Sequence, residues 1–183
     1  MQVNKIVVSI AGNFLSALAI IGFLGVTYMK PANASHDVWD DEVLCMAKNM
    51  YWESRNQTVE GLIAVGNVVM NRVSDNRYPD TVCEVIEQGP TYKSWKDENT
   101  YYPIKNKCQF SWYCDGKTDE IPDNDYKIFE IIYDIAMKVE GGYLEDRTSG
   151  ATHYHAYYVL PSWAKTKTRT AKIADHIFYR WEK

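Results

Sequence analysis

The stretch AKNMYWESRNQTVEGLIAVGNVVMNRV, residues 47–73, holds the end of one predicted helix, a polar turn and a second helix. Apolar residues recur at helical spacing before the turn, as at Met46 and Met50. Thr58 is a suitable N-cap for the second helix, predicted over Val59–Val73. Apolar residues nearly surround that helix, so we expect it to be buried at the centre of the fold.

A single acid, Glu53, stands where the first helix ends. It continues the i, i+4, i+7 series of Met46 and Met50, which places it at the edge of the apolar stripe. A carboxyl group there is partly desolvated, and desolvation raises its pKa. Such an acid suits general acid catalysis. Glycoside cleavage usually employs two carboxylates, and the candidates for a second one are Glu60, Asp115 and Asp175.

Other segments around this stretch also have helical signals. The first helix is expected to start at Asp40 or Asp41. A short helix is predicted within YPDTVCEVIEQG, residues 78–89, because Thr81 and Glu84 form a capping box. Residues 124–139 form the clearest helix, with apolar residues at helical spacing: Ile128, Ile131, Ile132, Ile135 and Val139. Residues 91–123 are predicted to be a long loop, and loops of that length are usually functional.

The C-terminal part predicts a small sheet. ATHYHAYYV, residues 151–159, alternates like a strand, with His153 and His155 on one face and Tyr154 on the other. A basic loop, AKTKTRTAK (residues 164–172), leads to a second strand in IADHIFYRW, residues 173–181. An antiparallel hairpin or meander is the simple pairing. The expected fold class is therefore α+β, mostly helical, with a small C-terminal antiparallel sheet.

The N-terminus differs from the rest of the chain. Residues 6–28 carry no charge, and as a helix they would reach roughly 34 Å, enough to cross a bilayer core. Ala32 and Ala34 form an A-x-A cleavage pattern before Ser35. Residues 1–34 are thus expected to be a cleaved signal peptide or an uncleaved membrane anchor; a buried soluble helix is the third reading. The first two readings predict export to the periplasm or cell envelope. Residues 35–183 are then expected to form one catalytic domain.

The net charge and the composition limit the classes of partner that the protein is expected to bind. The formal net charge is −4 and no basic run appears, which argues against nucleic acid as the main partner. The chain is rich in Tyr (14) and Trp (6). Aromatic side chains of this kind either line clefts for sugars, peptides or bases, or build the core.

The cysteine count is even, at four: Cys45, Cys83, Cys108 and Cys114. In an exported domain this predicts two disulfides, with three possible pairings. Cys108 and Cys114 could close a loop, and Cys45 and Cys83 could join two predicted helices. A four-thiolate zinc site is the alternative, although no C-x-x-C pair exists.

Histidines offer two further chemistries. His153 and His155 on one strand face, with His176, could bind zinc as in an amidase, or could form hydrogen bonds in a polar cleft. A nucleophile pair of Cys108 or Cys114 with His153 is a third option, and export and the even cysteine count argue against it.

Five blocks of the sequence, in this order along the chain, resemble a known protein family. They are the opening stretch, RYPDTVCEVI (77–86), CQFSWYCDG (108–116), ATHYHAYYVLPSWA (151–164) and IADHIFYR (173–180). Together they resemble the SleB/CwlJ-type cell-wall hydrolase family, which includes spore-cortex lytic enzymes and bacteriophage relatives. The family pattern around the acid is similar to Y-x-E-A-R-G-E. In this chain Glu53 and Arg55 match the pattern, whereas Ser54, Asn56 and Gln57 differ from it.

The resemblance implies a fold like that of lysozyme-like transglycosylases, with Glu53 as the single catalytic acid. It implies cleavage of peptidoglycan glycan strands between N-acetylmuramic acid and N-acetylglucosamine, without metal or cofactor, as a lytic transglycosylase. Residues in the matching blocks, with nearby aromatic residues, become candidates for substrate binding: Gln109, Ser111, Trp112, His153, Tyr154, His155, Trp163, His176 and Tyr179. The alternatives are a zinc-dependent amidase and a non-catalytic peptidoglycan-binding protein.

Overall fold

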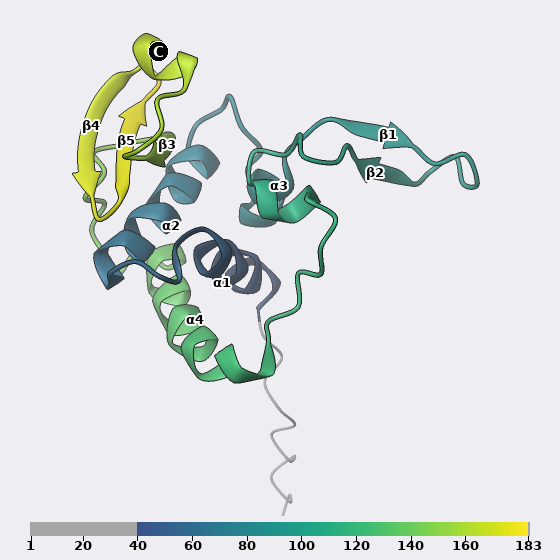
Figure 1. Ribbon diagram of the computed structural model, residues 1–183, viewed down its shortest axis with the longest axis horizontal. Coiled ribbons are helices and arrows are strands. Elements are labelled where there is room, and N and C mark those ends of the chain that lie inside the picture. Colours follow the sequence, from purple (N-terminus) through teal and green to yellow (C-terminus); the bar gives the residue numbers. More distant parts are fainter. Residues whose placement is uncertain (1–39, 183) are drawn as a thin grey trace, which may run out of the picture. The chain divides into compact units, whose positions relative to one another are not determined.

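The computed structural model describes residues 40–182, in which four α-helices and two small sheets form (Figure 1). The helices are α1 (Asp41–Ser54), α2 (Val59–Val73), α3 (Val82–Glu87) and α4 (Tyr126–Glu140). None of the described helices is long and apolar enough to cross a membrane. The expected signal peptide or anchor at 1–34, and the apolar segment 6–28 within it, lie outside the described residues.

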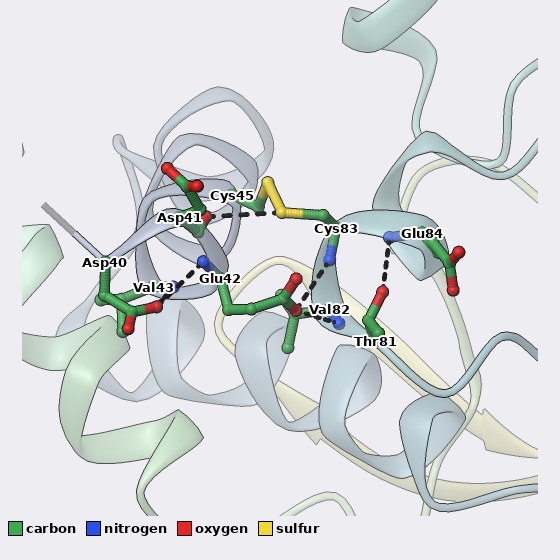
Figure 2. Close-up of a disulfide and its surroundings, with 9 residues drawn as sticks. All are labelled: Asp40, Asp41, Glu42, Val43, Cys45, Thr81, Val82, Cys83 and Glu84. Carbon is green, nitrogen blue, oxygen red and sulfur yellow. Dashed lines mark hydrogen bonds between the residues drawn. A yellow bond between two sulfur atoms is a disulfide. The ribbon is translucent and has the colours of Figure 1, made fainter.

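Helices α1, α2 and α3 start where the sequence predicts, and each has an N-cap. The Asp40 carboxylate accepts hydrogen bonds from the N–H groups of Glu42 and Val43, and the hydroxyls of Thr58 and Thr81 cap α2 and α3. The start of α3 is also held from α1, because the Glu42 carboxylate accepts from two N–H groups of α3, those of Val82 and Cys83 (Figure 2).

The core lies between the helices. Met46, Met50 and Tyr51 of α1 are fully buried, and α2 is buried along nearly its whole length, as expected. Gly66 permits close packing, because a Cβ atom there would lie 3.1 Å from Val139 Cγ1. The helix predicted over residues 124–139 is confirmed as α4, although Ile131 is 61% exposed and Ile128 is exposed too. Ile132 and Val139 of the predicted series do lie on the buried face of α4, together with Phe129 and Ala136.

The region predicted as a long loop contains some regular structure. Strands β1 (Thr91–Lys93) and β2 (Tyr101–Pro103) form an exposed antiparallel hairpin. A 3₁₀ helix, η1 (Ser111–Cys114), follows, and a second, η2 (Asp123–Asp125), precedes α4. Two disulfides, Cys45–Cys83 and Cys108–Cys114, are present, and they select one of the three possible pairings. The first joins α1 to α3 (Figure 2).

The C-terminal sheet has three strands, one more than predicted. Strands β3 (His153–Ala156), β4 (Thr168–Ile173) and β5 (His176–Arg180) are antiparallel in the order β3-β5-β4. A 3₁₀ helix, η3 (Ser162–Thr166), precedes β4. Much of the expected basic loop 164–172 is therefore strand β4, an edge strand whose Lys and Arg side chains suit its exposed position. Phe178 and Ala151 pack against Ala64 and Val68, which joins the sheet to α2.

Candidate active site

Glu53 lies in the last turn of α1, at the point where the helices meet the sheet. Its Oε2 accepts a hydrogen bond of 2.9 Å from the hydroxyl of Tyr154 on β3. Burial raises the pKa of the Glu53 carboxyl, and the Tyr154 hydrogen bond and the charge of Arg72 oppose that rise. The predicted setting of this acid at the margin of the core is therefore confirmed.

One cavity beside Glu53 has a volume of about 220 Å³. We call it the first cavity. Helix α1, helix α2, the η1 segment and the strand β3 all contribute to its wall. Besides Glu53 it contains five of the predicted substrate-binding residues and two that were not among them. Its lining consists of Glu53, Arg72, Gln109, Phe110, Ser111, His153, Tyr154 and Trp163.

A second cavity, of about 420 Å³, shares Glu53 and Ser111 with the first. We call it the second cavity. The polar turn after α1 and the η1 segment form it, and Trp112 and Asp115 are among its residues. The remaining lining residues are Trp52, Ser54, Arg55, Asn56, Gln57 and Lys117. The Glu53 side chain thus borders two cavities.

The segment that carries Gln109 and Ser111 is held on both sides. The Cys108–Cys114 disulfide closes it, and the Gln109 N–H donates to the Gln88 carbonyl at 2.9 Å. The indole N–H of Trp112 donates to the Asn49 side chain on α1 at 3.0 Å. These contacts position the segment against the end of α1.

His153 lines the first cavity as a neutral imidazole. Burial, with the charges of Arg72, Lys167 and Arg77, lowers its pKa to about 3. Its Nδ1 atom is 2.9 Å from the hydroxyl of Thr152. A neutral ring beside Glu53 can orient a substrate by hydrogen bonding, but it cannot act as a cationic acid at neutral pH.

Three predicted residues do not line either cavity. His155 and Tyr179 are buried and their rings stack 5.2 Å apart, with the imidazole Nε2 atom 3.1 Å from the tyrosine hydroxyl. His176 is buried with its ring centroid 5.0 Å from that of Tyr154. These three side chains therefore pack within the C-terminal sheet, where His176 contacts the cavity residue Tyr154.

A zinc site has no visible basis in residues 40–182. No group of three or more His, Cys, Asp or Glu side chains in this range gathers closely enough to hold a metal ion. All four cysteines are in disulfides. His153 and His155, proposed above as zinc ligands, instead contact a hydroxyl, a backbone carbonyl and a tyrosine.

Sequence reasoning did not single out Arg72 as a site residue. Arg72 lies in the last turn of α2, and its Nε–H donates to the Thr152 carbonyl at 2.8 Å. A signal was available, because it is the only charged residue of α2 after the first turn of an otherwise apolar helix. Asp115, one of the candidates for a second carboxylate, does reach the second cavity, whereas Glu60 is exposed on α2.

A family model described as Cell Wall Hydrolase matches residues 56–179. This chain belongs to that family. The match begins just after Glu53, so it covers α2, the η1 segment and the sheet, but not the acid itself. The resemblance inferred from the ordered blocks is therefore confirmed at the level of the family.

Similar proteins agree with this assignment. This chain is 25% identical over 150 residues to a spore cortex-lytic enzyme of Halalkalibacterium halodurans. The match spans 81% of this chain but only 38% of that protein. The crystal structure of the catalytic domain of Bacillus cereus SleB is similar with a TM-score of 0.55 and 25% identity, covering 76% of this chain and 89% of that one. The catalytic domain of the germination-specific lytic transglycosylase SleB of Bacillus anthracis has the same fold, with a TM-score of 0.55, 23% identity, and coverage of 81% and 100%.

Proposed function

We propose that this protein cleaves peptidoglycan glycan strands between N-acetylmuramic acid and N-acetylglucosamine, with Glu53 as the catalytic acid. The observation that carries the proposal is the position of the Glu53 carboxyl: it borders both cavities, and burial keeps its pKa raised. Membership of the cell wall hydrolase family supports the substrate class. Such a substrate lies outside the cytoplasmic membrane, so the proposal includes export of the chain.

In the first step the protonated Glu53 donates its proton to the glycosidic oxygen while the bond from that oxygen to C1 of the muramic acid breaks. Positive charge develops on this ring as an oxocarbenium-like state. The Tyr154 hydroxyl stabilises the Glu53 carboxylate that results, because it donates a hydrogen bond to Oε2. Gln109, Ser111 and the neutral His153 supply further polar contacts along the first cavity.

For the second step we favour the transglycosylase route. The Glu53 carboxylate takes the proton of the 6-hydroxyl of the same sugar as that oxygen bonds to C1, which leaves a 1,6-anhydro end. This route needs only one carboxylate. Hydrolysis is the second candidate, because Asp115 lines the second cavity and hydrogen bonds from Lys117 lower its pKa. An ionised Asp115 can activate a water molecule.

The first test replaces the acid. Glu53→Gln should reduce the release of soluble fragments from purified peptidoglycan by about 10²- to 10⁴-fold, the usual contribution of a general acid. The matched control is Glu130→Gln, because Glu130 is exposed on α4 and lines neither cavity. A variant at position 53 that keeps most of the activity would exclude this mechanism.

The same variant provides its own test of folding. Because burial raises the pKa of Glu53, the ionised carboxylate destabilises the fold once the pH rises through that pKa. Glu53→Gln should therefore be at least as stable as the parent protein at neutral pH, and the two should differ little at acid pH. A lower Tm for the variant at neutral pH would contradict the burial assigned to this group.

Product analysis distinguishes the chemistries. Mass spectrometry of digested peptidoglycan should find 1,6-anhydromuropeptides, and Asp115→Asn should leave their yield unchanged. Reducing ends that disappear with Asp115→Asn would establish hydrolysis instead. Release of peptides, inhibited by a metal chelator, would identify an amidase, and binding to sacculi without any soluble product would identify a wall-binding protein.

A further inference from the structure

Arg72 is a buried cation whose charge acts on Glu53, but the proposed mechanism gives its guanidinium group no ligand. Only 4% of its surface is exposed, and its Nη1 atom has no hydrogen-bond partner in the described part of the chain. None of the ion pairs among residues 40–182 includes it. Buried guanidinium groups are usually paired with an anion, because leaving one unpaired is costly.

The surroundings of Arg72 hold its side chain in place. The Nε–H group is bound to the Thr152 carbonyl, and the guanidinium carbon lies 5.1 Å from the ring centre of Phe110 and 5.5 Å from that of Tyr78. Aromatic rings at these distances stabilise a cation without neutralising it. The side chain is also part of the wall of the first cavity, which it shares with Glu53 and His153.

The charges around the first cavity favour an anion. Of the other titratable residues in its lining, His153 and Tyr154 are neutral, since burial lowers the pKa of the first and raises that of the second. Glu53 is neutral while it holds its proton. The charges of Lys167 and Arg77 also act on His153, although Arg77 is paired with Asp75. With Glu53 ready to donate, the cavity therefore carries the positive charge of Arg72.

We propose that Arg72 binds a carboxylate of the substrate, namely the lactyl carboxylate that N-acetylmuramic acid carries where its stem peptide has been removed. This inference rests on the proposed function. The lactyl group is attached to O3 of the ring whose C1 is attacked, so it is the acidic group nearest to the scissile bond. N-acetylglucosamine lacks this group, which makes Arg72 a determinant of specificity as well as of affinity.

Binding of the carboxylate also affects the acid. The positive charge of Arg72 favours the ionised form of Glu53. An anion bound to Arg72 reduces that influence, so a substrate with a free lactyl carboxylate should keep Glu53 protonated to higher pH. The basic limb of the kcat profile, which reports the enzyme–substrate complex, should therefore lie at higher pH for this substrate than for one without the carboxylate.

The first test changes the substrate and leaves the full-length protein intact. Glycan strands stripped of peptides are compared with the same strands after carbodiimide coupling has converted the lactyl carboxylates to neutral methylamides. We expect kcat/KM to be about 10- to 100-fold higher on the free carboxylates, as for a charge-assisted hydrogen bond. Equal rates on the two substrates overturn the role of Arg72 and leave the proposed function standing.

Two other outcomes are informative. If neither kind of strand is cleaved, and peptide-bearing peptidoglycan is not cleaved either, the proposed function itself fails. If discrimination appears only between peptide-bearing strands with free and with blocked stem-peptide carboxylates, the anion comes from the peptide, and the lactyl assignment is wrong.

The second test combines substrate and protein changes. Arg72→Met should lower kcat/KM more on carboxylate strands than on methylamide strands, so that the ratio of the two falls to about one; Arg72→Lys should restore part of that ratio. The control is Arg180→Met, because Arg180 is exposed and paired with Glu182. An equal loss on both substrates would mean that Arg72 has only a structural role.

Discussion

Glu53 is subject to two opposing influences. Burial at the edge of the helical core favours the protonated carboxyl, whereas the Tyr154 hydroxyl and the charge of Arg72 favour the carboxylate. An acid that first donates and then accepts a proton needs both forms within reach at one pH. The balance depends on residues from α2 and β3, so it can be adjusted at either position without moving the acid itself.

Tyr154→Phe tests this balance. Loss of the hydroxyl removes a hydrogen bond to the ionised form, so the pKa of Glu53 should rise further. Activity that requires the protonated acid is lost as the pH rises through that pKa, so the basic limb of the kcat/KM profile should move to higher pH. Tyr157→Phe is the matched control, because Tyr157 is exposed. An unchanged limb, or one moved to lower pH, would contradict the assignment.

At the scale of secondary-structure elements, the two disulfides contribute differently to the stability of the fold and to the position of the cavity residues. Cys45–Cys83 joins α1 to α3 across 38 positions, and its loss should cost about 4 kcal/mol by the chain-entropy estimate. Cys108–Cys114 spans only 6 positions, for which the same estimate is about 2 kcal/mol. The shorter loop, however, carries Gln109 and Ser111, which line the first cavity.

Serine pairs at these positions should therefore separate stability from activity. Cys45→Ser with Cys83→Ser should lower the urea midpoint more, yet keep most of the activity at temperatures where the variant is folded. Cys108→Ser with Cys114→Ser should lower the midpoint less and reduce kcat/KM by about tenfold or more, because the lining residues lose their position. Equal activity in the two folded variants would argue against a positioning role for the shorter loop.

At the scale of the whole described region, the candidate site exists only because the sheet is docked on α2. Phe178 is fully buried in the contact with Ala64 and Val68, and its ring lies 5.7 Å from that of Tyr154. Helix α1 supplies the acid, α2 supplies Arg72, and β3 supplies Tyr154 and His153. Loosening this junction should affect both stability and catalysis.

Phe178→Ala should cost about 3–5 kcal/mol in the free energy of unfolding, as for other buried phenylalanines. The folded fraction should also be less active, because the ring that supports Tyr154 is gone. Ile177→Ala is the matched control, since Ile177 is adjacent on β5 and only partly buried. Urea unfolding and kcat/KM would be measured on both variants, and a smaller loss at position 178 than at 177 would refute this account of the junction.

The sequence by itself determined the α+β class, the start of each of α1, α2 and α3, the burial of α2 and the place of Glu53 at the edge of the core. These features depend on spacing and capping within about 15 residues, which a pattern can report. The resemblance, carried by the ordered blocks, also identified the family.

Tertiary structure alone decided the rest. Strand β4 is polar and basic, and it is a strand because β5 offers it backbone hydrogen bonds, not because of its own pattern. The exposure of Ile131 depends on which side of α4 meets α1 and α2. Most of all, Arg72 and Asp115 come to Glu53 from other elements. Cavities and the charges that face them arise from long-range packing, and no local periodicity records which distant side chains will share a wall.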